Sequence, residues 1–240
     1  MLTRLPEGFY QSSQLCRISG LVHGYSTRAI GDMRGASARK GFLRLLGLTD
    51  SSLIMGEQIH GSVVGMVGNV SAREILGVDG LVARSKSVPI GVAAADCVPL
   101  LLVDPTKGIV AAVHAGWRGT LANIASAAVG KMADQGSNVR DIVVSIGPHI
   151  GMCCYTVAKE RIDRFVSLFG QDPKMTAYSE NAWHLDIGWV NYRQLRDAGV
   201  LVSHIDAPPV CTSCQSDIFY SYRKDTKESF GEILAVIGMT

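Results

Sequence analysis

The sequence predicts an α+β fold arranged as a layered sandwich, and three features support this prediction. Short β-branched runs are separated by turn residues, which is typical of strands. Longer segments carry apolar residues at three- and four-residue spacing, which is typical of helices. The expected strands occur in pairs and threes between the helices, and this order favours an α+β sandwich over the strict alternation of a doubly wound sheet.

The expected strands are short and rich in Val, Ile and Leu. Several of them have no polar residue at alternate positions, so we expect both of their faces to be buried. The strands cover residues 62–67, 88–95, 98–103, 108–114, 139–146 and 233–237.

Helical spacing occurs in three segments. The first covers residues 120–135, ends before Gly136 and carries its apolar stripe on Leu121, Ile124, Ala125, Ala128 and Met132. The second covers residues 158–169. The third covers residues 188–198 and ends before Gly199, the usual C-terminal position of glycine.

The composition is that of a globular protein and argues against several functional classes. Of the 240 residues 47% are apolar and 18% charged, and the formal net charge is +2. This charge gives no general attraction to nucleic acid or acidic membranes, so we expect neither as a partner. We find no apolar leader, membrane-spanning segment, repeat or flexible linker, so we expect a single domain over residues 1–240, acting as a monomer in the cytoplasm.

Three candidate metal ligands lie at the ends of expected strands, where functional sites are usually built. His60 precedes one strand, Cys97 lies between two others, and His114 ends a fourth. Two imidazoles and one thiolate form the ligand set of a catalytic zinc site whose fourth position is open. The long gaps between the three residues match no compact zinc-finger pattern, so a second interpretation stays open, in which all three are core or turn residues.

The other cysteines form a second group. Six cysteines over this length are too sparse for a secreted disulfide scaffold, so we expect them to be reduced. Cys211 and Cys214 have the C-x-x-C spacing of zinc ribbons and redox motifs, whereas Cys153 and Cys154 are adjacent. Because neighbouring side chains diverge, we expect core packing or incidental thiols here rather than a four-sulfur metal site.

Residues 116–120 form a glycine-rich turn at the start of the first expected helix. Backbone N–H groups at a helix N-terminus favour an anion, so phosphate binding is one interpretation and a simple packing turn is the other. Arg28 and Arg223 are candidate bidentate phosphate donors, although each alone is more often a surface cation.

Taken together, several segments resemble the YfiH family, whose members are variously described as laccase-domain, polyphenol oxidase or purine nucleoside phosphorylase proteins. The segments are QIHG, VDGLV, ADCVPLLLVD, VAAVHAGWRGT, IGPHIGMCCYTV, HLD and FYSYRKD. The resemblance runs from about Val22 to the C-terminus, and ADC followed by HAGWRG is its most specific part.

The resemblance implies a cytoplasmic α/β/β/α layered domain with a zinc site formed by His60, Cys97 and His114. It also implies phosphorolysis of adenosine, inosine and methylthioadenosine, and deamination of adenosine. A multicopper oxidase needs about ten histidines and the sequence has 6, so we expect any copper at this site to be adventitious.

The sequence departs from the family pattern at the expected mouth of the site. Residues 29–34 replace a glycine-rich stretch, Thr156 stands where the family has a carboxylate, and Lys224 replaces the second of two arginines. The glycine-arginine pair that normally follows is absent near Gly231. These departures affect the expected substrate preference more than the expected metal site.

In the resulting hypothesis a zinc ion generates hydroxide near neutral pH, and a carboxylate shuttles the proton. Asp96 is the carboxylate nearest to Cys97 in the sequence and is the predicted catalytic residue. Because successive strand residues face opposite ways, these two side chains share one site only if the strand is irregular there. The residues predicted to bind nucleoside and phosphate are Arg28, Gln58, Arg118 and Arg223.

Two other functions stay open. Cys97 as a nucleophile with His114 as its base would make a metal-free cysteine hydrolase or deamidase, with His60 as an orienting group. A non-enzymatic cell-envelope housekeeping module would have a structural metal or none, and would turn over no nucleoside. Metal content and a panel of nucleosides distinguish the three.

Overall fold

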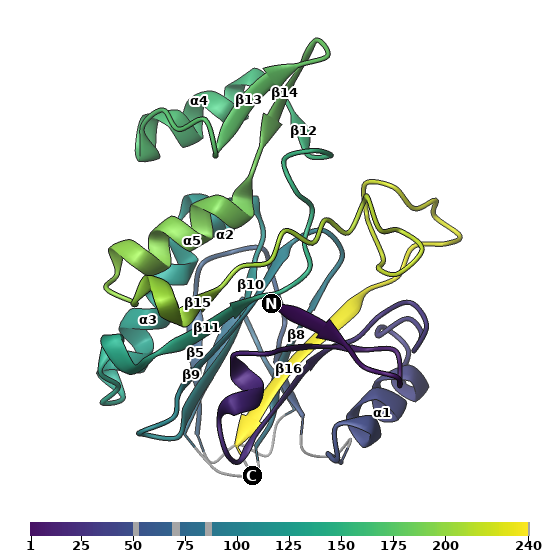
Figure 1. The fold of residues 1–240 in the computed structure, drawn as a ribbon, viewed down its shortest axis with the longest axis vertical. Coiled ribbons are helices and arrows are strands. Elements are labelled where there is room, and N and C mark those ends of the chain that lie inside the picture. The colour runs from purple at the N-terminus through teal and green to yellow at the C-terminus, as the bar shows by residue number, and fades with distance from the viewer. Residues whose placement is uncertain (50–52, 69–72, 85–87, 240) are drawn as a thin grey trace.

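The computed structural model describes residues 1–49, 53–68, 73–84 and 88–239. Two mixed β-sheets pack face to face, and helices cover both outer faces of the pair (Figure 1). This arrangement confirms the predicted α+β class and the α/β/β/α layering.

In the described part of the chain, the first sheet has seven strands in the order β1, β2, β3, β16, β8, β4, β6. Strand β16 lies at the centre and is antiparallel to both β3 and β8, so both ends of the chain belong to this sheet. The strands are β1 Leu2–Arg4, β2 Tyr10–Ser12, β3 Leu21–Tyr25, β4 Ile54–Gly56, β6 Glu74–Ile75, β8 Ile90–Ala94 and β16 Ile233–Met239.

The second sheet has six strands among the described residues, in the order β15, β11, β9, β10, β7, β5. The strands are β5 Val64–Val67, β7 Gly80–Ala83, β9 Val98–Asp104, β10 Ile109–Ala115, β11 Val143–Ile146 and β15 Ile205–Asp206. Strands β9 and β10 form an antiparallel hairpin whose register pairs His114 with Pro99. This register places His114 beside the start of β9, next to Cys97.

Strand β9 contributes to two apolar cores. Leu101 and Val103 pack between the sheets, whereas Leu100 and Leu102 pack toward the helices. Because successive side chains of a strand point to opposite faces, this strand is apolar at every position before Asp104. Full burial of one such side chain contributes about 1.5–3 kcal/mol to stability.

Helices α2 (Trp117–Leu121), α3 (Ile124–Asp134) and α5 (Ile187–Asp197) cover the outer face of the second sheet. Helix α1 (Ala36–Leu45) covers the first sheet, with Phe42 packed against Leu234 and Val236 of β16 in one core. The sequence does not predict α1, because its large apolar residues lie only in the last four positions, after Gly41.

The prediction of one continuous helix over residues 120–135 is wrong. The helix is interrupted at Asn123, whose φ is +61°. Helix α2 ends at Leu121 and α3 begins at Ile124. Gln194 of α5 stabilises the break, because its Nε2 donates to the Thr120 carbonyl at 2.6 Å and its Oε1 accepts from the Ala125 N–H at 3.3 Å. The apolar spacing continues across the break, so periodicity alone does not reveal it.

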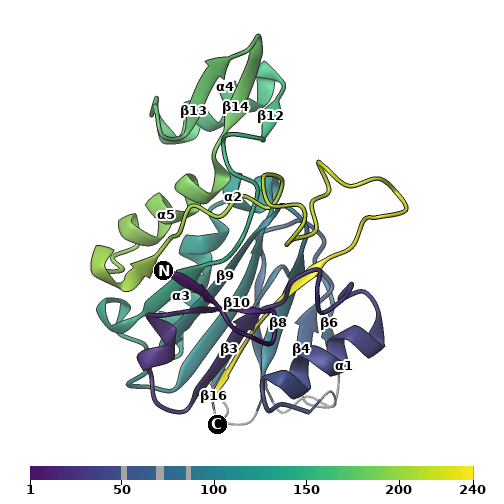
Figure 2. The same ribbon diagram turned by 45° about the vertical axis from the view of Figure 1, so that its right-hand side comes forward.

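A small lobe projects from one end of the sandwich (Figures 1 and 2). It contains α4 (Lys159–Phe169) and a sheet in the order β12, β14, β13. The strands are β12 Thr156–Val157, β13 Thr176–Ser179 and β14 Ala182–Leu185. The helical spacing over residues 158–169 predicts α4, whereas no pattern in the sequence predicts these three strands.

The remaining elements of the described residues are short 3-10 turns, at Leu15–Arg17, Val139–Asp141 and Val202–His204. The second of these occupies the start of the strand predicted over 139–146, so that strand begins only at Val143. Among the described residues we find no helix with the length and apolar character needed to span a bilayer.

Candidate metal centre and active-site cavity

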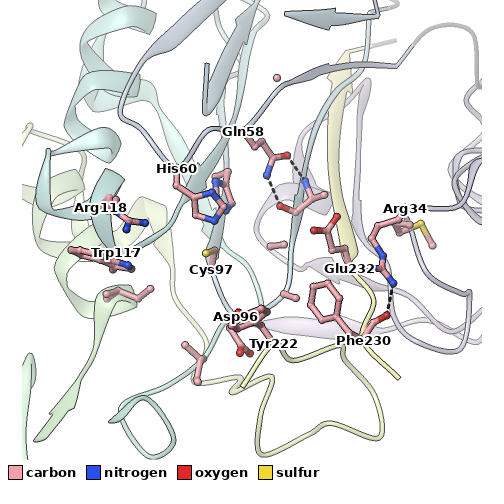
Figure 3. Close-up of a pocket in the computed structure, with 18 of the residues that line it drawn as sticks. Arg34, Gln58, His60, Asp96, Cys97, Trp117, Arg118, Tyr222, Phe230 and Glu232 are labelled. Atoms are coloured by element: carbon pink, nitrogen blue, oxygen red, sulfur yellow. Dashed lines mark hydrogen bonds between the residues drawn. The ribbon is translucent and has the colours of Figure 1, made fainter. Parts of the chain in front are cut away.

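His60, Cys97 and His114 converge from three places in the fold. His60 lies in the loop after β4, Cys97 lies between β8 and β9, and His114 belongs to β10. The ligand atoms of the three side chains all lie within 4.8 Å of one another, and the two imidazole rings meet edge to face with centroids 4.8 Å apart. Figure 3 shows the cluster beside the cavity. The structure thus brings together the three residues predicted to bind a metal.

The backbone around this cluster is unusual. Gln58, His60 and Asp96 have φ angles of +57°, +60° and +80°, a region that non-glycine residues adopt uncommonly. Such strained backbone tends to cluster at functional sites. The side-chain amide of Gln58 exchanges two hydrogen bonds with the backbone of Ala93 and so fixes the loop against β8. The irregular backbone at Asp96 lets both Asp96 and Cys97 line the cavity.

Two glycines leave room for the cluster. A Cβ on Gly116 would lie 3.2 Å from Sγ of Cys97 and 3.3 Å from Cδ2 of His60. A Cβ on Gly119 would lie 2.5 Å from the carbonyl oxygen of Gly61, which is too close for any side chain. The glycines of the 116–120 turn therefore let α2 approach the histidine loop.

Asp79 supports both histidines from a fully buried position. Its Oδ1 lies 2.9 Å from Nδ1 of His114 and also accepts a hydrogen bond from the His60 backbone N–H. Its Oδ2 accepts one from the Gly61 N–H at 2.6 Å. A carboxylate on Nδ1 fixes the imidazole tautomer and leaves Nε2 available for a metal.

The charges in the cluster favour a thiolate. Burial by itself raises the pKa of Cys97, but the positive charge of His114 and hydrogen bonds with both histidines lower it to about 7. Burial lowers the pKa of His114, whereas the Cys97 thiolate and Asp79 raise it to about 9. A thiolate and two imidazoles at this spacing, backed by a carboxylate, fit one divalent ion of the zinc type.

The cluster opens into a cavity of about 830 Å³, within the usual range for small-molecule sites. Arg118 and Arg161 lie over the ring of Trp117, at 4.6 and 4.1 Å from its centroid. Arg223 lines the same cavity and donates to the carbonyl and hydroxyl oxygens of Thr156. The cavity thus combines a metal-ligand cluster, an aromatic ring and several guanidinium groups.

Comparison with known proteins identifies the family. Residues 29–240 match the family described as multi-copper polyphenol oxidoreductase laccase. The chain belongs to this laccase family. The chain is 37% identical over 193 residues to purine nucleoside phosphorylase YlmD of Geobacillus stearothermophilus, which covers 76% of this chain and 70% of that protein. It is 34% identical over 207 residues to adenosine deaminase RL5 of an unknown prokaryotic organism, which covers 81% and 79%.

Two solved structures have the same fold as this chain. The structure of YlmD from Geobacillus stearothermophilus matches with a TM-score of 0.87 and 30% identity, covering 99% of this chain and 98% of that one. The YfiH protein of Bacillus licheniformis matches with a TM-score of 0.89 and 26% identity, covering 100% and 99%. These matches confirm the resemblance to YfiH proteins, and the relatives' names confirm the expectation of an enzyme.

Three of the four predicted substrate-binding residues line the cavity, namely Gln58, Arg118 and Arg223. Arg28 does not line it. One Nη of Arg28 lies 2.7 Å from both carboxylate oxygens of Asp225, and its guanidinium lies over the ring of Tyr220. Arg28 is therefore bound to a neighbouring segment of the protein.

Asp96, the predicted catalytic residue, lines the cavity but has both oxygens engaged. Oδ1 accepts a hydrogen bond from the Thr212 hydroxyl at 2.6 Å, and Oδ2 accepts one from the Arg223 backbone N–H at 2.7 Å. These bonds attach the segment that carries Arg223 to the loop that carries Cys97.

Two acidic residues of the site, Asp79 and Glu232, are not among those predicted from the sequence. Asp79 is a polar residue directly before an apolar strand, the same signal that singles out Asp96. Glu232 directly precedes β16 and lines the cavity, and burial raises its pKa. Figure 3 shows its carboxyl group across the cavity from Cys97.

The four other clustered cysteines do not behave as expected. Sγ of Cys153 and Sγ of Cys154 each lie 3.4 Å from Sγ of Cys214. The expectation that adjacent cysteine side chains diverge is therefore wrong here, because one turn brings both to the same sulfur atom.

Proposed function

We propose that this chain is a zinc-dependent enzyme that cleaves adenosine, inosine and methylthioadenosine with phosphate and also deaminates adenosine. The observation that carries the proposal is the convergence of His60, Cys97 and His114 on an open cavity, with Asp79 orienting both histidines. Relatives named purine nucleoside phosphorylase and adenosine deaminase support this substrate class. We further propose that the whole chain is one domain and that it acts as a cytoplasmic monomer.

His60, Cys97 and His114 would hold the zinc ion, and such an ion supplies Lewis acidity at an open coordination position when bound. Asp79 keeps the Nδ1 side of His114 occupied, so that this ring presents Nε2. Gly116 keeps the space beside Cys97 and His60 free. These residues prepare the site before substrate enters.

Phosphorolysis breaks the C1′–N9 bond toward an oxocarbenium-like sugar, and a phosphate oxygen forms the new bond at C1′. The phosphate needs cations at one side of the sugar. We assign this role to Arg118, Arg161 and Arg223, because all three line the cavity. The ring of Trp117 holds the first two guanidinium groups in place before phosphate binds.

The opposite part of the cavity suits the purine. Tyr222 and Phe230 line it with rings in edge-to-face contact, at a centroid distance of 5.7 Å. Aromatic faces stack on nucleobases without a strong preference for one base, which fits a site for several purines. Arg28 then acts indirectly, because it holds Asp225, whose carboxylate accepts the N–H of Ser221 beside Tyr222.

Deamination needs a group that accepts a proton from the water attacking C6 and returns it to the departing ammonia. Asp96 is the carboxylate predicted for this role, but its oxygens already accept two hydrogen bonds. We favour Glu232, because it lines the cavity and burial raises its pKa above its ordinary value. Asp96 then positions Arg223.

The test is direct. Purified protein should release hypoxanthine and ribose 1-phosphate from inosine and phosphate, and ammonia from adenosine. The Cys97→Ala variant should lose both activities together with its active-site metal, whereas Cys16→Ser, which changes a cysteine outside both clusters, should keep them. Undiminished turnover in Cys97→Ala refutes the assignment.

One observation favours a second candidate, a metal-free cysteine hydrolase. The pKa of Cys97 is lowered to about 7 beside His114, which resembles a nucleophile paired with its base. Under this alternative, removal of metal by a chelator leaves the hydrolase activity intact, whereas alkylation of Cys97 by iodoacetamide abolishes it. Under the zinc proposal, chelation removes activity and zinc restores it.

A further inference from the structure

A second group of metal-ligand side chains lies outside the cavity cluster. The sulfur atoms of Cys153, Cys154, Cys211 and Cys214 all lie within 4.8 Å of one another. The first pair comes from the turn before β12 and the second from the segment after β15. Two segments far apart in the chain therefore present four thiols to one point.

We propose that these four cysteines bind a single zinc ion as a structural centre. Zinc in structural sites is tetrahedral with Zn–S bonds of about 2.3 Å, which places neighbouring sulfur atoms about 3.8 Å apart. The contacts of 3.4 Å made by Cys214 and the upper limit of 4.8 Å for the group lie on either side of that value. An ion at the centre needs only small side-chain rotations.

The backbone around the sulfur atoms is suited to this role. The Gly151 N–H donates to Sγ of Cys211 at 3.2 Å, a contact that supports a thiolate ligand. A Cβ on Gly151 would lie 3.3 Å from Sγ of Cys153 and 3.4 Å from Cβ of Cys211, so this glycine leaves space for the cluster. The Gly151 carbonyl accepts the Cys154 N–H and closes the turn that presents both adjacent cysteines.

Other fates of four thiols fit less well. A disulfide joins two sulfur atoms at about 2.05 Å and uses only one of the two that contact Cys214. An iron–sulfur cluster places several iron and sulfide atoms between its cysteines, which requires more space than a group within 4.8 Å provides. One ion uses all four sulfur atoms, and its binding displaces the thiol protons to solvent.

The proposed centre joins two segments that border the cavity. Tyr155 follows the first cysteine pair and lines the cavity, and Arg223 follows the second pair and also lines it. Thr212, inside the C-x-x-C motif, donates to Asp96 beside Cys97. The ion would therefore hold the arginine-bearing segment against the turn that carries Tyr155. This role does not depend on the reaction that the cavity catalyses.

Metal analysis tests the proposal. The parent protein is purified without added metal and then incubated with zinc. It should hold about one more equivalent of zinc per chain than Cys214→Ser or Cys153→Ser treated in the same way, whereas Cys16→Ser should match it. Cys97→Ala should lose the metal at the cavity and keep the zinc ion bound by the four cysteines of the second cluster. Equal zinc content in the parent and both cluster variants overturns the proposal.

A second measurement uses the intact cluster, in case the serine variants do not fold. Cobalt added to metal-free Cys97→Ala should give thiolate-to-cobalt charge-transfer absorption and the intense visible bands of a tetrahedral ion, because its remaining clustered thiols belong to this centre. Zinc should displace the cobalt and remove both features. Absence of thiolate–cobalt bands, or a mass and thiol count showing a disulfide in the purified protein, overturns the proposal whether or not nucleosides are turned over.

Discussion

Oδ1 of Asp79 lies 2.9 Å from Nδ1 of His114, and both side chains are buried beneath the cavity. The same oxygen accepts the backbone N–H of His60. One carboxylate thus orients two of the three candidate ligands, one through its ring and the other through its loop. Because Asp79 is not itself a ligand, its removal separates orientation from coordination.

The Asp79→Asn variant should bind zinc about 10–100-fold more weakly, which is the usual effect of removing such a partner of a ligating histidine. Competition with a chromophoric chelator measures this affinity. Asp104→Asn is the matched control, because Asp104 is also buried and accepts backbone N–H groups, but in the turn between β9 and β10. Equal zinc affinity in Asp79→Asn and the parent protein would show that the carboxylate does not orient the ligands.

Metal-free protein should show a reactive Cys97. The thiolate is the nucleophile, and its fraction rises as the pH passes the pKa, which the charge of His114 and hydrogen bonds lower to about 7 despite burial. Alkylation by iodoacetamide should therefore accelerate with pH and level off above about 7. His114→Ala should shift the midpoint upward, and bound zinc should protect the thiol.

Cys16 provides an internal comparison in the same experiment. Partial burial raises its pKa, so its alkylation should begin only at higher pH. Peptide mass spectrometry follows both sites in one sample. A common midpoint for the two cysteines would mean that the histidines do not activate Cys97.

The predictable parts of the fold are those where sequence pattern and environment agree. Strands β9 and β10 are apolar except for Asp104 and His114 near their ends, because both faces are covered, and their apolar runs predict them directly. The strands of the small lobe have only two to four residues and are largely half-buried or exposed, so they leave no such pattern. The break at Asn123 depends on Gln194 of α5, a tertiary contact that local spacing does not encode.

The site follows the same rule. Polar residues at the ends of apolar strands single out His60, Cys97 and His114, and their convergence follows from the pairing of β9 with β10 and the loop after β4. The role of Asp79 depends on a partner 35 residues away in the sequence. Arg28 is predicted from the sequence to bind phosphate, but in the structure it binds Asp225. Its neighbours in the sequence do not reveal this partner, which lies 197 residues away.

Glu232→Gln should lower kcat for adenosine deamination by about 10²–10⁴-fold, the usual contribution of a positioned proton carrier. Its carboxylate must be ionised to accept a proton, so activity of the parent protein should rise with pH through the pKa of Glu232. Burial raises this pKa above its ordinary value of 4.5, so this rise should lie at higher pH than for an exposed glutamate. The variant should lack this limb of the pH profile.

Two further variants identify the proton carrier. Glu57 has an exposed carboxylate that lines the same cavity and accepts the Gly77 N–H. Glu57→Gln should therefore keep the pH profile of deamination seen in the parent protein. Asp96→Asn should raise KM for phosphate through Arg223 while the acidic limb stays in place. Loss of that limb in Asp96→Asn and its persistence in Glu232→Gln would return the role to Asp96.

Arg118→Gln and Arg28→Gln should separate phosphate binding from structural support. Arg118 lines the cavity and stacks on Trp117, so its loss should raise KM for phosphate in inosine phosphorolysis and change the thermal midpoint little. Arg28 binds Asp225, whose side chain is 7% exposed, so its loss leaves a buried carboxylate without its cation. This should cost about 1–3 kcal/mol of unfolding free energy.

Steady-state kinetics at varied phosphate and thermal unfolding of the same samples give both quantities. Deamination consumes no phosphate, so Arg118→Gln should affect phosphorolysis more than deamination, whereas a folding defect lowers both together. A raised KM for phosphate in Arg28→Gln at unchanged stability would mean that Arg28 leaves Asp225 and contacts the anion in the working enzyme. An unchanged KM in Arg118→Gln would instead leave Arg161 and Arg223 as the anion-binding pair, because both line the cavity and both contact Tyr155.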